Sequence, residues 1–223
     1  MKKLLLFIGI FLSLDFGCAC GATTNPEDLC RKIAQADFKK AEIISHLGKI
    51  NYIGEYSSEK LAEKFPERAV KNQDMLGLTA IALEYSVILH INKYKMSDGS
   101  FCVYPKNVQV DIGYSNPTIY LSSDLKKGSC VYKRTLRHEW QHLVLIYIYF
   151  QQYIHSIKRN LSSGPQILVT KKTETADNLL QQKYSETIEK IHSANMEKLM
   201  EFEKQLDSFE NYQNEGNLCK SDE

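Results

Sequence analysis

The segment from residue 132 to residue 153 constrains the fold most, because it contains no glycine and no proline. Apolar residues recur in it at helical spacing and cover nearly the whole circumference, which predicts a long helix over about 132–158. They are Leu136, Leu143, Leu145, Ile146, Tyr147, Ile148, Phe150 and Ile154. A helix that is apolar nearly all round is expected in the interior of a domain.

This helix carries the pattern His-Glu-x-x-His at residues 138–142. Two histidines four residues apart lie one above the other on a helix, so His138 and His142 can both reach one metal ion. Glu139 follows the first histidine and can take a proton from a metal-bound water. The pattern predicts a catalytic Zn²⁺ site, whereas an amphipathic helix with two surface histidines is the alternative.

A catalytic zinc needs a third protein ligand, and a second long helix, predicted over 173–209, is the expected source. With a short connection and antiparallel packing, residues 186–194 would lie level with the motif. His192 is on or beside the inward stripe of that helix and is the predicted ligand. Glu189 and Glu186 are the alternatives.

The rest of the chain predicts a mixed helix and strand domain. Helices are expected at 26–47 and 57–65, with Pro26 in the first turn and Pro66 after the second. Alternating apolar residues predict strands at 79–95, 103–112 and 118–122, with a hairpin turn at 97–100. The expected fold is α+β, with a twisted antiparallel sheet packed on the motif helix and on the long C-terminal helix.

Residues 1–22 have the features of a signal peptide: a basic start, an apolar run over 4–14 and small residues near the end. This predicts a secreted or periplasmic product, with one domain over 23–223. Lipid attachment at Cys18 or Cys20 is the alternative. No later segment is apolar enough to span a membrane, and the oligomeric state is left open.

Four further cysteines, Cys30, Cys102, Cys130 and Cys219, suggest two disulfides in an oxidising compartment. Spacing allows three pairings. We expect Cys102 with Cys130, bracing the motif helix against the sheet, and Cys30 with Cys219, joining the two ends. Four buried free thiols are the alternative.

The charge balance argues against some partners. Lysine and arginine number 28 and aspartate and glutamate number 27, and no basic run is interleaved with aromatic residues. Nucleic acid is therefore an unexpected partner. No Gly-x-Ser-x-Gly elbow or glycine-rich phosphate loop supports another chemistry.

Several stretches between residues 77 and 219 look like a family of secreted bacterial zinc-dependent peptidases. They are residues 77–79 (GLT), 98–105 (DGSFCVYP), 108–114 (VQVDIGY), 119–121 (IYL), 128–132 (GSCVY), Leu136 with the histidine motif, 206–212 (LDSFENY) and Cys219. The resemblance implies a zincin-like fold, a bound zinc ion and peptidase activity, with His138 and His142 as ligands.

The motif and the resemblance together predict a zinc-dependent metallohydrolase acting on a peptide or protein, with Glu139 as general base. One alternative is a non-catalytic envelope protein with a structural or vestigial zinc site. An amidase acting on cell-wall peptides is another, within the same class of hydrolases.

Overall fold

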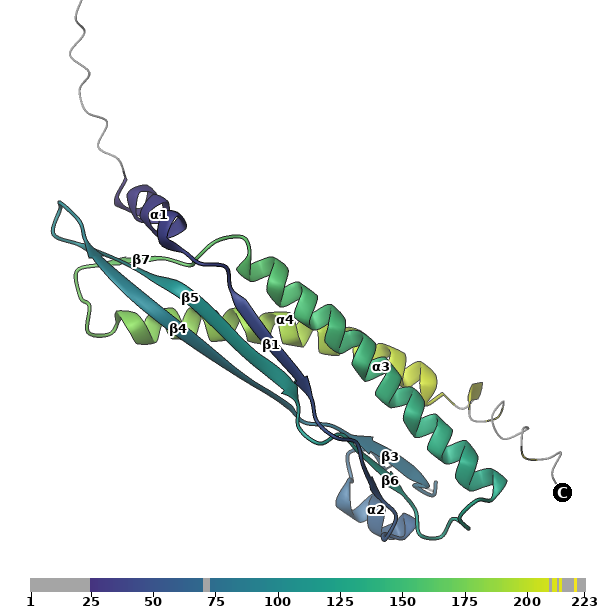
Figure 1. The fold of residues 1–223 in the computed structure, drawn as a ribbon. Helices are drawn as coiled ribbons and strands as arrows, with labels where there is room; N and C mark the ends of the chain where they lie inside the picture. Colours follow the sequence, from purple (N-terminus) through teal and green to yellow (C-terminus); the bar gives the residue numbers. More distant parts are fainter. Residues whose placement is uncertain (1–24, 70–72, 209, 212, 214–218, 220–223) are drawn as a thin grey trace, which may run out of the picture.

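The computed structural model describes residues 25–69, 73–208, 210, 211, 213 and 219. The predicted signal peptide, with Cys18 and Cys20, lies outside these residues. The fold is α+β, as the sequence predicts (Figure 1). In chain order the elements are α1 (Pro26–Asp37), β1 (Glu42–Leu47), β2 (Asn51–Ile53), α2 (Ser58–Lys64), β3 (Gly77–Ala80), β4 (Leu83–Lys95), β5 (Phe101–Tyr114), β6 (Thr118–Leu121), α3 (Cys130–Leu161), β7 (Leu168–Thr170) and α4 (Ala176–Leu206).

The strands form two mixed sheets, so the prediction of one antiparallel sheet is wrong. The larger sheet has the order β1-β5-β4, with β7 also paired to β5, and the smaller has the order β2-β6-β3. β1 runs parallel to β5 and β2 runs parallel to β6, while the other pairs are antiparallel. The parallel strands arise because residues 42–47, predicted to continue the first helix, form β1 instead.

Apart from β7, the two sheets are built from the same three chain segments, and each segment is interrupted between its two strands. The predicted single strand over 79–95 is divided there into β3 and β4. Gly48 donates its backbone N–H to Tyr114 O at 2.7 Å, and Asn116 has a positive φ of 50°. A Cβ atom at Gly48 would lie 2.3 Å from Asn116 N, so only glycine fits this close approach.

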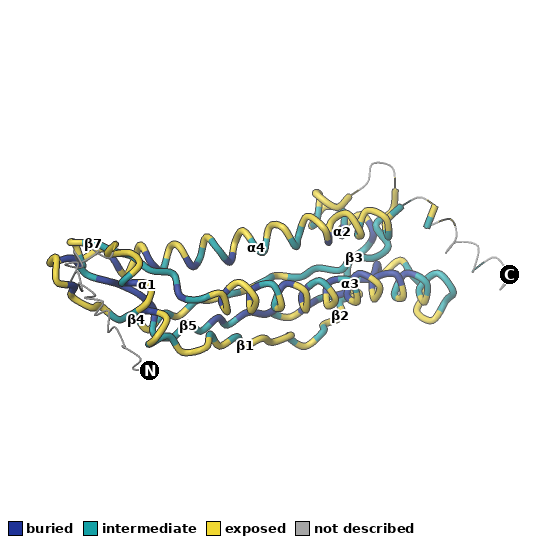
Figure 2. The backbone as a smooth tube through the Cα atoms, turned by 90° about the horizontal axis from the view of Figure 1, so that it is seen from above, coloured by how far each residue is buried: buried dark blue, intermediate teal, exposed yellow. Residues whose placement is uncertain are grey.

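Helices α3 and α4 run antiparallel along one face of the larger sheet (Figure 1). Val108, Val110 and Ile112 alternate along β5 and are completely buried against the two helices. Phe150 and Ile157 of α3 and Tyr184 and Ile188 of α4 complete this core. Buried and exposed residues alternate along both helices (Figure 2).

The first half of α3 extends past the larger sheet and covers the smaller one. Leu143 packs there with Ile119 and Leu121 of β6. The motif thus lies at the end of the molecule that carries β3, β6 and α2 (Figure 1).

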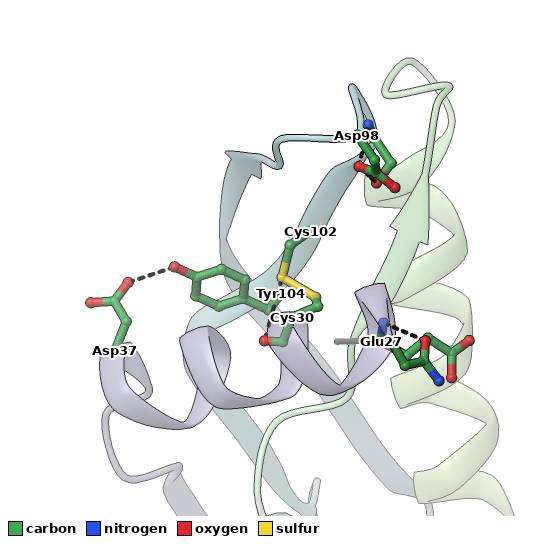
Figure 3. The surroundings of a disulfide bond; sticks show 8 residues. Glu27, Cys30, Asp37, Asp98, Cys102 and Tyr104 are labelled. Carbon is green, nitrogen blue, oxygen red and sulfur yellow. Dashed lines mark hydrogen bonds between the residues drawn. A yellow bond between two sulfur atoms is a disulfide. The ribbon is translucent and has the colours of Figure 1, made fainter. Parts of the chain in front are cut away.

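Two disulfides form, as predicted, but the predicted pairing is wrong. Cys30 is bonded to Cys102, and Cys130 is bonded to Cys219. Cys102 lies at the start of β5, whereas Cys130 lies at the start of α3, near the other end of the molecule (Figure 1). The 14 residues of β5 span about 45 Å, so the two cysteines cannot meet. The first bond fixes α1 on β5 (Figure 3), and the second joins the start of α3 to the C-terminal tail.

No helix in the described parts of the chain is long and apolar enough to cross a membrane.

Candidate metal centre

The motif lies in the N-terminal half of α3, where its three chemically relevant side chains are buried. Ser129 caps the helix by accepting a hydrogen bond from Tyr132 N at 3.2 Å. The exposed fractions are 3% for His138, 5% for Glu139 and 8% for His142. Buried polar side chains require partners, so their surroundings indicate their role.

Asp207, the residue that follows the last turn of α4, meets both histidines. Its Oδ1 atom lies 3.0 Å from His138 Nε2 and 3.1 Å from His142 Nε2. The two Nε2 atoms are 3.3 Å from each other. Three potential ligand atoms therefore converge on one point from α3 and from the end of α4.

These separations fit a tetrahedral zinc site. Ligands about 2.0 Å from a tetrahedral zinc lie about 3.3 Å from one another. Two imidazoles and one carboxylate are also a donor set that zinc accepts, and such a set leaves the fourth position open. The arrangement can therefore hold one metal ion through His138, His142 and Asp207.

His192 is not among the residues that meet at this point. Its ring packs on Tyr153, with the ring centroids 5.4 Å apart, further along α3. The two alternatives also lie elsewhere: Glu189 accepts a hydrogen bond from Tyr85 OH, and Glu186 accepts one from Gln182.

The register between the two helices explains this difference. Residues 162–175 include β7, which pairs with the start of β5, so α4 begins well beyond the end of α3. Tyr184 lies level with that end, where its hydroxyl accepts a hydrogen bond from Gln166 N. The whole of α4 is thereby displaced, and Asp207, about four turns after His192, lies level with the motif.

Sequence reasoning did not find Asp207, although it lies within the stretch 206–212 that resembles the peptidase family. Asp207 falls inside the helix predicted over 173–209, where a single aspartate indicates only an exposed polar position. No local pattern links it to a motif more than sixty residues earlier.

A second carboxylate lies near Nδ1 of His142, the ring nitrogen that does not face Asp207. Glu203, one turn before Asp207 on α4, has its Oε1 3.8 Å from His142 Nδ1 and its Oε2 3.9 Å from Arg68. Burial lowers the pKa of His142, but the carboxylates of Asp207 and Glu203 outweigh this effect and raise that pKa to about 9. Burial raises the pKa of Asp207, whereas both histidines act more strongly and hold it below its usual value.

Glu139 is positioned by β3. Its Oε2 accepts a hydrogen bond from Thr79 Oγ1 at 2.8 Å. Gly77 lies directly against it, since a Cβ atom there would be 2.6 Å from Glu139 Oε1. Burial raises the pKa of Glu139, and this effect exceeds the lowering by His142, Thr79 and His138. A raised pKa favours proton exchange near neutral pH, which suits a general base.

The three candidate ligands and Glu139 line a cleft of about 590 Å³, within the size range of ligand sites. Its lining residues come from α3 between Arg134 and His142, from Arg68 and residues 73–79, and from the end of α4. A ligand can therefore approach the histidines and Glu139 together.

Comparison of the chain with family models, curated proteins and solved structures gives no match. The resemblance to the zinc-dependent peptidases therefore rests on the residues quoted above.

Proposed function

We propose that this protein is an exported zinc-dependent hydrolase that cleaves peptide bonds. The observation that carries the proposal is the convergence of His138, His142 and Asp207 in a cleft that Glu139 also lines. A structural zinc site is usually closed by four protein ligands and has no need of a carboxylate beside the ligands. Three ligands, an open side and an adjacent buried base favour catalysis.

The residues have distinct roles in this proposal. His138, His142 and Asp207 would hold the metal ion, which when bound would lower the pKa of a water molecule and polarise the substrate carbonyl. Glu139 accepts the proton of the attacking water and passes it to the leaving amine. Thr79 keeps the Glu139 carboxylate in place through its hydrogen bond, and Glu203 orients the His142 ring from behind.

The two disulfides support export, because such bonds persist in oxidising compartments. The apolar start of the chain agrees with this location.

The test compares the oxidised chain of residues 23–223 with its Glu139→Gln variant. We expect about one zinc ion per chain in both proteins by metal analysis. Turnover of a peptide library by the variant should fall roughly a hundred- to ten-thousand-fold. Equal turnover of the two proteins would exclude Glu139 as the base. Zinc in both without turnover by either would favour a non-catalytic envelope protein.

A further inference from the structure

The cleft contains a cationic side chain that the proposed hydrolysis does not use. Arg68 and Arg134 both line it. Arg68 is paired with Glu203. Arg134, by contrast, makes no ion pair or hydrogen bond with any residue that the structure describes.

Arg134 occupies a defined place relative to the candidate ligands. It precedes His138 by one turn on α3, so Arg134, His138 and His142 form one stripe along the helix. Four residues correspond to about 6 Å along a helix axis. An extended peptide covers about 3.3 Å per residue. A substrate group at Arg134 would thus lie about two residues from a carbonyl at the metal.

A guanidinium matches a carboxylate, because its planar N–H groups donate two parallel hydrogen bonds. The other charges in the cleft do not provide this partner. Glu203 pairs with Arg68, while Asp207 and Glu139 belong to the candidate metal centre. Asp74 also lines the cleft, where it is exposed and forms no pair with Arg134.

We infer that Arg134 selects substrates that carry a carboxylate about two residues from the scissile bond. This inference rests on the proposed function, since it names the substrate class of the same cleft. The carboxylate is either the C-terminus of a peptide or an acidic side chain within a longer one. Its chemistry is the same in both cases.

The experiment uses zinc-loaded, oxidised protein and peptides that differ in one group. Glu is exchanged for Gln at each position within three residues of the cleaved bond, and the C-terminus is a free acid or an amide. We expect the carboxylate form to be cleaved with a kcat/KM about ten- to a hundredfold higher. Preference for the free acid would identify the C-terminus, and preference for internal Glu would identify the side chain.

The variant Arg134→Gln should reduce this ratio to about one while it retains zinc. Arg134→Lys should restore part of the ratio, because it returns the charge without the planar fork. Arg137→Gln, on the exposed face of the same turn, is the matched control and should keep the wild-type ratio. An unchanged ratio in Arg134→Gln, or no preference in the wild type, would overturn the inference.

A binding measurement separates this inference from the proposed function. The affinity of the zinc-loaded Glu139→Gln protein for the same peptide pairs is measured by calorimetry, with and without Arg134→Gln. Preference for the carboxylate form that depends on Arg134, without turnover by the wild type, would leave the recognition intact and remove the peptidase proposal. Equal affinities for both forms would overturn the recognition.

Discussion

Asp37 and Asp207 lie at opposite ends of the molecule, each in the part of the chain that a disulfide braces, and the two aspartates differ in their polar neighbours. Asp37, near Cys30–Cys102, accepts hydrogen bonds from Asn92 at 2.6 Å and Tyr104 at 3.2 Å, with Lys106 at 3.6 Å. Figure 3 shows the Tyr104 contact beside the disulfide. Asn92, Tyr104 and Lys106 act as hydrogen-bond donors to this carboxylate and do not offer it the lone pairs of a zinc site.

Asp207, at the other end, meets two imidazole nitrogens that also lie 3.3 Å from each other. Each neutral imidazole has one donor and one lone pair, and which nitrogen carries the proton depends on its surroundings. Three converging atoms of this kind can share a cation, whereas the donors around Asp37 already satisfy its carboxylate. Identity of the neighbours, rather than burial or charge alone, thus distinguishes a candidate metal centre from a structural contact.

The largest expected difference between the ends is in zinc affinity. We expect Asp207→Asn to lower it more than a hundredfold, because losing a direct ligand should exceed the 10–100-fold cost of losing an outer partner. The matched variant Asp37→Asn should bind zinc like the wild type. Competition with a chromogenic chelator measures both. Retention of zinc by Asp207→Asn within tenfold of the wild type would remove Asp207 from the ligand set.

The two disulfides should have similar effects on stability and different effects on the metal. The sequence separations are 72 for Cys30–Cys102 and 89 for Cys130–Cys219. Replacing either pair by serine should therefore cost about 4 kcal/mol of unfolding free energy in chemical denaturation. Zinc affinity should fall, by about tenfold, only without Cys130–Cys219, which anchors the chain beyond Asp207. Equal loss of zinc affinity in both double variants would contradict this local role.

The smallest expected effect is on the pH dependence of thermal stability, and it concerns His192, which lies between the two ends. Burial lowers its pKa, so the unfolded chain binds this proton more readily. The contribution of His192 to the free energy of unfolding should be fully present above the usual histidine pKa. It should be lost as the pH falls below that value. The melting temperature of metal-free His192→Gln should fall less than that of the wild type between about pH 7.5 and 5.5. Zinc content should be unchanged, and its loss would restore His192 as a ligand.

The sequence predicted the elements whose signals are local. The apolar spacing predicts the helix around the motif over 132–158, and the helix extends from Cys130 to Leu161. The hairpin turn at 97–100 also forms, between β4 and β5. Both depend on near neighbours in the chain: the motif helix on apolar spacing without breakers, and the turn on Asp98 and Gly99.

The tertiary structure alone decided what depends on long-range register. β1 replaces the last six residues of the helix predicted over 26–47, because a parallel pairing with β5 outweighs the local preference of residues 42–47. The disulfide pairing follows from the length of β5, and the displacement of α4 follows from the pairing of β7.

The candidate site divides in the same way. His138, Glu139 and His142 can be predicted from the sequence because one helix presents all three within two turns. Asp207 and Thr79 acquire their places only when α4 and β3 are packed on α3. The cleft that Arg134 lines also forms only then. Residues distant in the chain are brought together by the packing of whole elements. A single sequence records the preferences of those elements, but it does not record how far one is displaced along another.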